Sequence, residues 1–69
     1  MRLSTRNQLA GTVRQIRTGE AMATVKVELL SGEVITAAIT AEAVEDLGLQ
    51  SGSSVTVLVK STEVMLATD

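Results

Sequence analysis

Two short stretches, one near each end of the chain, place a cation directly beside small hydroxyl side chains. They are STR at residues 4–6 and KST at residues 60–62. Arginine and lysine donate hydrogen bonds without accepting any, and hydroxyl groups add neutral donors. A tetrahedral dianion, which offers only acceptors, is the ligand that two cations and several such donors would suit. From spacing alone a simpler interpretation also fits: STR begins a strand, and KST forms the turn between the last two strands.

The composition excludes most catalytic chemistry. The 69 residues include no cysteine and no histidine, so the chain has no imidazole base, no thiolate nucleophile and no soft metal ligand. We therefore predict a protein that is not an enzyme, with no catalytic residues and no ligands for a metal cation. The acidic residues Glu42, Glu45 and Asp46 are interpreted as a solvated face, and no glycine-rich phosphate loop is recognised.

Charge and the lack of aromatic residues disfavour nucleic acids and membranes as partners. The formal net charge is -2, and no aromatic side chain is available to stack on bases. Four of the six cations lie within the first 17 residues, which keeps nucleic-acid binding as a minor alternative. No apolar run approaches the ~20 residues of a membrane span, and no signal peptide is recognised. We expect a cytoplasmic protein.

The apolar content predicts self-association. Hydrophobic residues make up 45% of the chain, yet none is aromatic. A domain of this size buries only roughly 60% of the surface of its unfolded chain, so its own core is thin. Small domains usually gain further stability from disulfides, metals or oligomerisation. Without cysteine or histidine, the expected solution is an obligate homo-oligomer.

Alternating side chains predict a β-hairpin in the first half of the chain. Residues 21–29 alternate between apolar and polar side chains, as in a half-buried strand. Ser31 and Gly32 separate this run from a second one, which ends at Ile39. Residues 21–39 are therefore predicted to form two antiparallel strands joined by a tight turn.

A short helix is predicted at residues 40–48. Thr40 can cap its N-terminus, and Gly48 can adopt the left-handed conformation that ends a helix. The alternation then resumes in residues 54–60 and again in residues 62–68, which predicts two further strands.

The first strand is predicted over residues 5–17, bent or bulged at Gly11. The resulting order is three strands, a short helix and two more strands. This is the element order of an OB-fold, so the predicted fold class is all-β, a five-stranded OB-fold-like barrel with one short helix between strands 3 and 4.

Two segments of the sequence resemble one known family. STRNQLAGTV at residues 4–13 and VEDLGLQSGSSVTVLVKSTEVML at residues 44–66 are similar to the molybdenum-pterin-binding proteins (Mop, or molbindin). The resemblance extends over essentially all 69 residues. It implies an OB-like fold that exchanges its N-terminal strand within a dimer, and a hexamer assembled as a trimer of dimers, with oxyanion sites between subunits.

The resemblance also implies which residues bind the anion, molybdate or tungstate. One subunit would contribute its N-terminal residues and another its C-terminal pair, and Thr5 would act through its backbone N–H. A secondary oxyanion site near the threefold axis would include Ile39 and Thr40, although Thr40 can equally serve as a helix cap. The principal oxyanion-binding residues implied in this way are Ser4, Thr5, Arg6, Asn7, Lys60 and Ser61.

These observations predict that residues 1–69 form a single molybdate-binding domain. Its function would be non-catalytic binding and storage of molybdate or tungstate in the cytoplasm, as part of metal homeostasis, with the bound oxyanion as its only cofactor-like ligand. The alternative is a structural or regulatory oligomer that binds a protein partner. In that case Arg6 and Lys60 would only form salt bridges between subunits.

Overall fold

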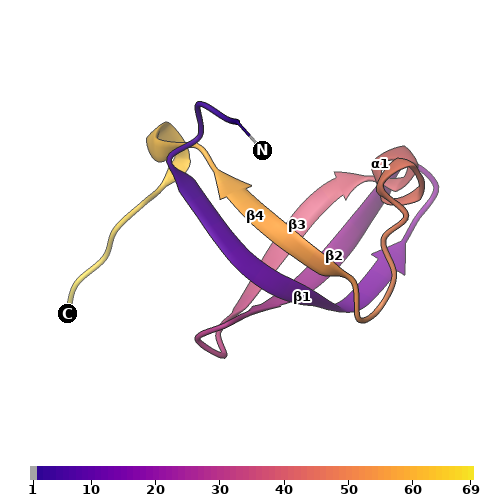
Figure 1. Ribbon diagram of the computed structural model, residues 1–69, viewed down its shortest axis with the longest axis horizontal. Coiled ribbons are helices and arrows are strands. Elements are labelled where there is room, and N and C mark those ends of the chain that lie inside the picture. Colours follow the sequence, from indigo (N-terminus) through magenta and orange to yellow (C-terminus); the bar gives the residue numbers. More distant parts are fainter. Residues whose placement is uncertain (1) are drawn as a thin grey trace.

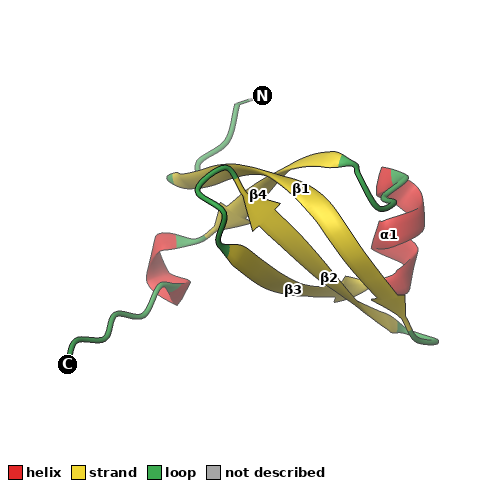
Figure 2. Cartoon of the chain, turned by 90° about the horizontal axis from the view of Figure 1, so that it is seen from below, coloured by secondary structure: helices red, strands yellow, loops and turns green. Residues whose placement is uncertain are grey.

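The structure, a computed structural model, describes residues 2–69. Within this range the chain forms one antiparallel sheet with strand order β3-β2-β1-β4, which curls into a half-barrel (Figures 1 and 2). Helix α1 lies between β3 and β4, and a single turn of 3₁₀ helix, η1, follows β4. The bounds of the elements are β1 (Asn7–Thr18), β2 (Met22–Leu29), β3 (Val34–Thr40), α1 (Ala41–Leu47), β4 (Ser54–Val59) and η1 (Ser61–Glu63).

The β2–β3 hairpin confirms the prediction made from alternation. Gly32 has a φ of 94° in the connecting turn, a conformation that favours glycine. The Gly32 N–H donates to the carbonyl of Leu29 at 2.9 Å, and the Leu29 N–H donates to the carbonyl of Glu33 at 2.8 Å. These two bonds close the turn and fix the register of the hairpin.

Strand β1 forms as predicted, but its bulge is not at Gly11. The register between β1 and β2 shifts between Val13 and Gln15, so Arg14 is the extra residue. Gly11 is required for a different reason: a Cβ atom there would lie 2.6 Å from Val27 Cγ1 and 2.9 Å from the Glu28 carbonyl oxygen. The glycine lets β2 approach closely, and the bulge bends the strand farther along.

Helix α1 begins and ends where its capping residues predict. The Thr40 hydroxyl accepts a hydrogen bond from the Ala43 N–H at 3.0 Å. Gly48 has a φ of 63°, and its N–H donates to the carbonyl of Glu45 at 3.0 Å. The helix packs on one end of the sheet through the buried side chain of Val44.

The core is small and consists of short side chains. It lies on the concave face of the half-barrel, where partly buried residues of β3 and β4 pack around it. Alternate positions of β2 point inward, as the sequence predicts. The buried hydrophobic residues are Val13, Ala23, Val25, Val27 and Val44.

The fifth strand, predicted at residues 62–68, is not formed in the described part of the chain. The N–H of Glu63 donates to the carbonyl of Lys60 at 2.9 Å, which closes the turn of η1. Residues 64–69 then carry no secondary structure and extend away from the sheet (Figure 1). The fold is therefore mainly β and OB-like, with four strands in a half-barrel rather than five in a closed barrel.

Strand β1 pairs within its own chain on both edges. It is hydrogen-bonded to β2 on one side and to β4 on the other. The exchange of the N-terminal strand, which the family resemblance implied, is thus not seen in the fold of the single chain. No helix among residues 2–69 has the length and apolar character needed to cross a membrane.

Candidate oxyanion site

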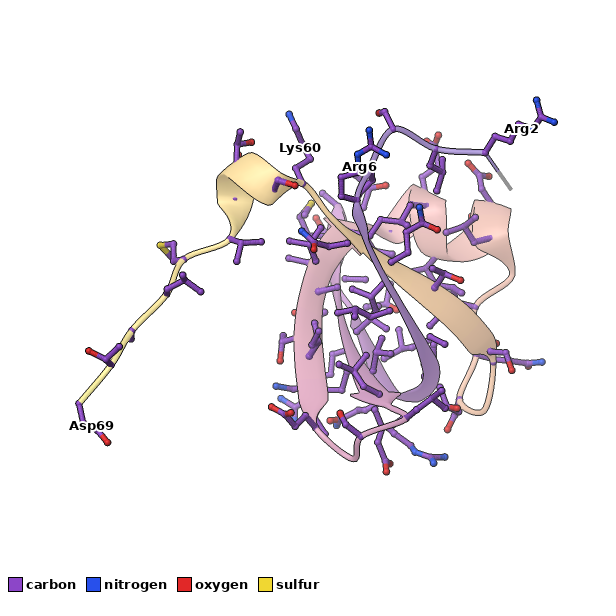
Figure 3. The ribbon with its side chains drawn as sticks, turned by 60° about the vertical axis from the view of Figure 1, so that its left-hand side comes forward. Arg2, Arg6, Lys60 and Asp69 are labelled. Carbon is purple, nitrogen blue, oxygen red and sulfur yellow. The ribbon has the colours of Figure 1, made fainter. Side chains whose placement is uncertain are left out.

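The antiparallel pairing of β1 with β4 brings the two ends of the chain together. Asn7 pairs with Val59 at the last rung of this ladder. One step beyond that rung the backbone places Arg6 opposite Lys60. Both side chains extend past the same end of the strand pair (Figure 3). The two cations are therefore neighbours within one chain, although 54 positions of sequence separate them (60 minus 6).

A pocket of about 170 Å³ lies between these chain ends. Its two sides are the segment that leads into β1 and the first residues after β4. Thr5 is partly buried in this pocket, and the other lining residues are exposed in the single chain. The lining residues are Ser4, Thr5, Arg6, Lys60, Ser61 and Thr62.

Two amide side chains hold the sides of the pocket in place. The Asn7 Nδ2 atom donates to the Val59 carbonyl at 3.1 Å, so it joins the strand ends beneath the pocket. The Gln8 Nε2 atom donates to the Thr5 carbonyl at 2.8 Å and constrains the bend before β1. These contacts give Asn7 and Gln8 positioning roles, because neither residue lines the pocket.

The charges of the pocket are all positive. Among residues 2–69 the only ion pair joins Arg14 Nε to Glu28 Oε1, at 2.7 Å. Arg6 and Lys60 have no carboxylate partner in this part of the chain. Two cations held near each other without a counter-charge favour an anion between them. The neutral hydroxyl groups around them can donate further hydrogen bonds.

The structure brings together five of the six residues implied for the principal site. Ser4, Thr5 and Arg6 meet Lys60 and Ser61 in one chain, whereas the resemblance placed the two groups in different subunits. Thr62 also lines the pocket. The KST motif contains it, but the implied set of site residues stops at Ser61.

The implied secondary residues lie elsewhere. Thr40 pairs with Met22 at the α1 end of the sheet, away from the pocket at the start of β1. Its hydroxyl is used as a helix cap, and the Ala41 N–H donates to the Ala21 carbonyl at 2.8 Å. Ile39 packs against the core. The local hydrogen bonds therefore support the capping interpretation of Thr40, and they leave few donors for an anion.

The fold and the site define a small OB-like domain with a cationic pocket at one end of its sheet. The TOBE domain family matches residues 3–66. The chain is 42% identical to "Molybdenum-pterin-binding protein 2" of Clostridium pasteurianum, over 96% of this chain and 97% of that protein. The chain belongs to the TOBE domain family, and within it to the molybdenum-pterin-binding (Mop) proteins. This is a family of binding proteins rather than enzymes.

Solved structures show the same fold. A molybdate-binding protein from Sporomusa ovata superimposes with a TM-score of 0.93 at 41% identity, covering 99% of this chain and all of that one. ModG, a cytoplasmic molybdate-binding protein solved with molybdate bound, gives a TM-score of 0.85 at 46% identity. In that case the match covers 88% of this chain and 43% of ModG.

Proposed function

We propose that residues 1–69 form one domain that binds and stores molybdate or tungstate in the cytoplasm. The observation that carries this proposal is the pocket between the chain ends, which contains two cations without a carboxylate partner and three hydroxyl-bearing residues besides Thr5. The names of relatives matched over nearly their whole length point to the same class of ligand.

The chemistry of the pocket is complementary to a tetrahedral dianion. Arg6 and Lys60 balance its two charges, and charge-assisted hydrogen bonds are the stronger kind. Hydroxyl groups of Ser4, Ser61 and Thr62 and the backbone N–H of Thr5 are available for its other oxygens. A pocket of donors alone also discriminates against phosphate, which largely retains a proton at neutral pH. That proton would lack an acceptor, at a cost of about 1–3 kcal/mol.

A second copy of the chain would complete the site. In the single chain the cations are exposed, so solvent screens their attraction for an anion. Covering the pocket with another subunit would exclude water and strengthen each contact. We therefore propose that the anion is bound at subunit interfaces of a homo-oligomer, a hexamer built as a trimer of dimers. The exposed apolar side chains of Leu30 and Leu47, at 87% and 69% exposure, support such assembly.

The same exposed side chains also fit a structural oligomer that binds a protein partner and no anion. One experiment separates the two functions: calorimetric titration with molybdate, tungstate, sulfate and phosphate, with native mass recorded at each step. Heat and a fixed stoichiometry with molybdate and tungstate, but not with phosphate, support the storage function. An oligomer that shows no heat with any of the four anions would refute it and support the structural protein.

A further inference from the structure

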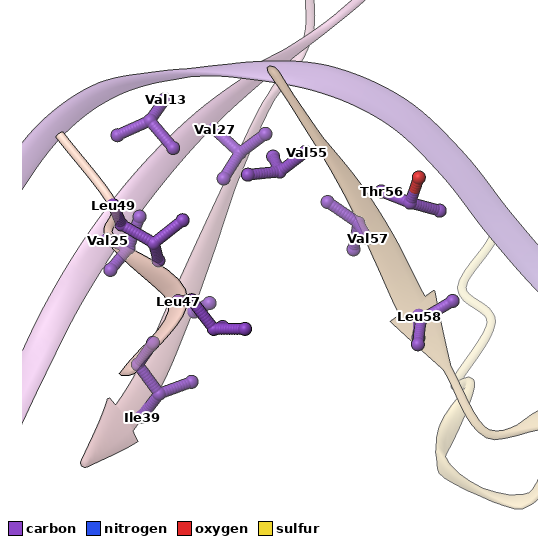
Figure 4. A pocket seen from close by; sticks show the side chains of 11 residues that line it. Val13, Val25, Val27, Ile39, Leu47, Leu49, Val55, Thr56, Val57 and Leu58 are labelled. Carbon is purple, nitrogen blue, oxygen red and sulfur yellow. The ribbon is translucent and has the colours of Figure 1, made fainter. Parts of the chain in front are cut away.

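The β1–β4 ladder is regular along the whole of β4. Odd-numbered residues of β4 are half-buried and even-numbered ones are exposed. Figure 4 shows Val55 and Val57 on the side of β4 that faces an apolar cavity of about 250 Å³, and Thr56 on the other side. The register with β1 is constant from Ser54 to Val59. The two strands therefore reach the pocket between the chain ends without a bulge in this ladder.

A constant register predicts which backbone groups should bond next. In an antiparallel ladder every second residue pair exchanges two N–H···O bonds. The Val13 N–H donates to the Ser53 carbonyl at 2.9 Å, which assigns the bonded pairs of this ladder to the odd-numbered residues of β1. Continued two residues beyond Asn7, the same register would join Thr5 to Ser61 by two such bonds.

The rung between Thr5 and Ser61 is not formed within residues 2–69, and other donors occupy both of its carbonyls. The Thr5 carbonyl accepts from Gln8 Nε2 at 2.8 Å. The Ser61 carbonyl accepts from the Val64 N–H at 3.4 Å, at the end of η1. Among the same residues the N–H groups of Thr5 and Ser61 donate to no other group. Both residues line the pocket, so the open rung leaves two backbone donors beside it.

We propose that Gln8 holds this rung open and so determines whether the pocket can bind an anion. The oxyanion takes the place of the rung, because its oxygens accept from the N–H groups of Thr5 and Ser61 that the ladder would otherwise use. Without the Gln8 amide, the Thr5 carbonyl is free to accept from the Ser61 N–H. That bond removes one donor and turns a carbonyl oxygen, which repels an anion, toward the other strand. Gln8 does not line the pocket, so it is a positioning residue.

The two states of the rung differ little in free energy, so one side-chain hydrogen bond can decide between them. The Gln8–Thr5 bond is exposed and joins residues only three positions apart. The rung that it prevents would lie at an exposed strand end, where a backbone hydrogen bond also has a small net effect. The inference rests on the proposed function for the identity of the ligand, but the state of the rung can be measured without any anion.

The first test observes the rung in the anion-free protein. Gln8→Met keeps the size of the side chain and removes its donor. Gln15→Met makes the same change at an exposed position farther along β1, and is the matched control. Amide hydrogen exchange followed by NMR should be at least about tenfold slower at Ser61 in Gln8→Met than in the parent or in Gln15→Met. Equal exchange at Ser61 in all three proteins would overturn the proposal.

The second test measures affinity and stability together. Calorimetric titration should show molybdate binding about tenfold weaker in Gln8→Met and unchanged in Gln15→Met, since the anion must first break the closed rung. The anion-free unfolding temperatures should agree, because the closed rung replaces the lost side-chain bond. A lower unfolding temperature for Gln8→Met with unchanged exchange at Ser61 would reveal a merely structural role and overturn the proposal. So would an unchanged affinity. If the parent itself binds no molybdate, the proposed function fails, whereas exchange at Ser61 still decides whether Gln8 holds the rung open.

Discussion

Replacing Arg6 by alanine tests the pocket most directly. Arg6 lies one step beyond the Asn7–Val59 rung, beside Lys60, and has no carboxylate partner among residues 2–69. Loss of a hydrogen bond to a charged group costs about 1.5–3 kcal/mol. Molybdate affinity should therefore fall about 10- to 150-fold. Because Arg6 neighbours a like charge, its removal should not lower the stability of the anion-free protein.

Thermal unfolding with and without molybdate separates these two effects. At 100 times its dissociation constant, molybdate should stabilise the parent protein by about 2.7 kcal/mol. At the same concentration, a variant that binds 50-fold more weakly should gain only about 0.6 kcal/mol. The anion-free unfolding temperatures should agree.

Two further variants sharpen this prediction. Arg17→Ala removes the same charge from an exposed position at the other end of β1, so it should retain the affinity of the parent. Arg6→Lys keeps the charge but loses the planar fork of donors, and should fall between the parent and Arg6→Ala. The reasoning is refuted if Arg6→Ala and Arg17→Ala weaken molybdate binding equally. It is also refuted if Arg6→Ala mainly lowers the anion-free unfolding temperature.

Three other substitutions test the fold around the site. Gly11→Ala places a methyl group 2.6 Å from Val27 Cγ1 and should lower the free energy of unfolding by about 1–3 kcal/mol in denaturant titrations; an unchanged midpoint would contradict the close approach of β2. Thr40→Ala removes the cap of α1 and should lower the free energy of unfolding by about 0.5–2 kcal/mol. Calorimetry should give the same number of molybdate ions per chain as for the parent; a smaller number would support a secondary oxyanion site at Thr40. Glu28→Gln breaks an exposed ion pair with Arg14 and should change stability by less than about 1 kcal/mol, so a larger loss in the same titrations would show that this pair is buried in the assembly.

The local elements could be predicted from the sequence because their signals are local. Alternation in residues 21–39 and the residues Thr40 and Gly48 are sufficient to define the hairpin and the helix. The sequence predicts a bulge at Gly11, but the bulge occurs at Arg14. A glycine in a strand can indicate either a bulge or the close approach of another strand, and the sequence does not distinguish the two. In the structure, Gly11 is required by the close approach of β2.

The relations between distant segments could not be predicted in the same way. Residues 62–68 have the alternation of a strand, but alternation does not say which sheet edge, or which copy, will receive it. The chemistry of the pocket was predictable from STR and KST, since both motifs combine a cation with hydroxyls. Their meeting in one chain depends on β1 lying beside β4. Neither periodicity nor composition specifies that neighbour relation, and the family resemblance implied an arrangement between subunits.

If the pocket binds an anion as proposed, its position beyond the last rung of the β1–β4 ladder gives that anion a route of release. Strand ends open locally at a much lower free energy than the whole domain unfolds. Separation of Asn7 from Val59 would move the two cations apart while Val13 and the residues around it stay packed. Loading and emptying can then be governed by the last few backbone hydrogen bonds of two strands, with no lid and no disruption of the core.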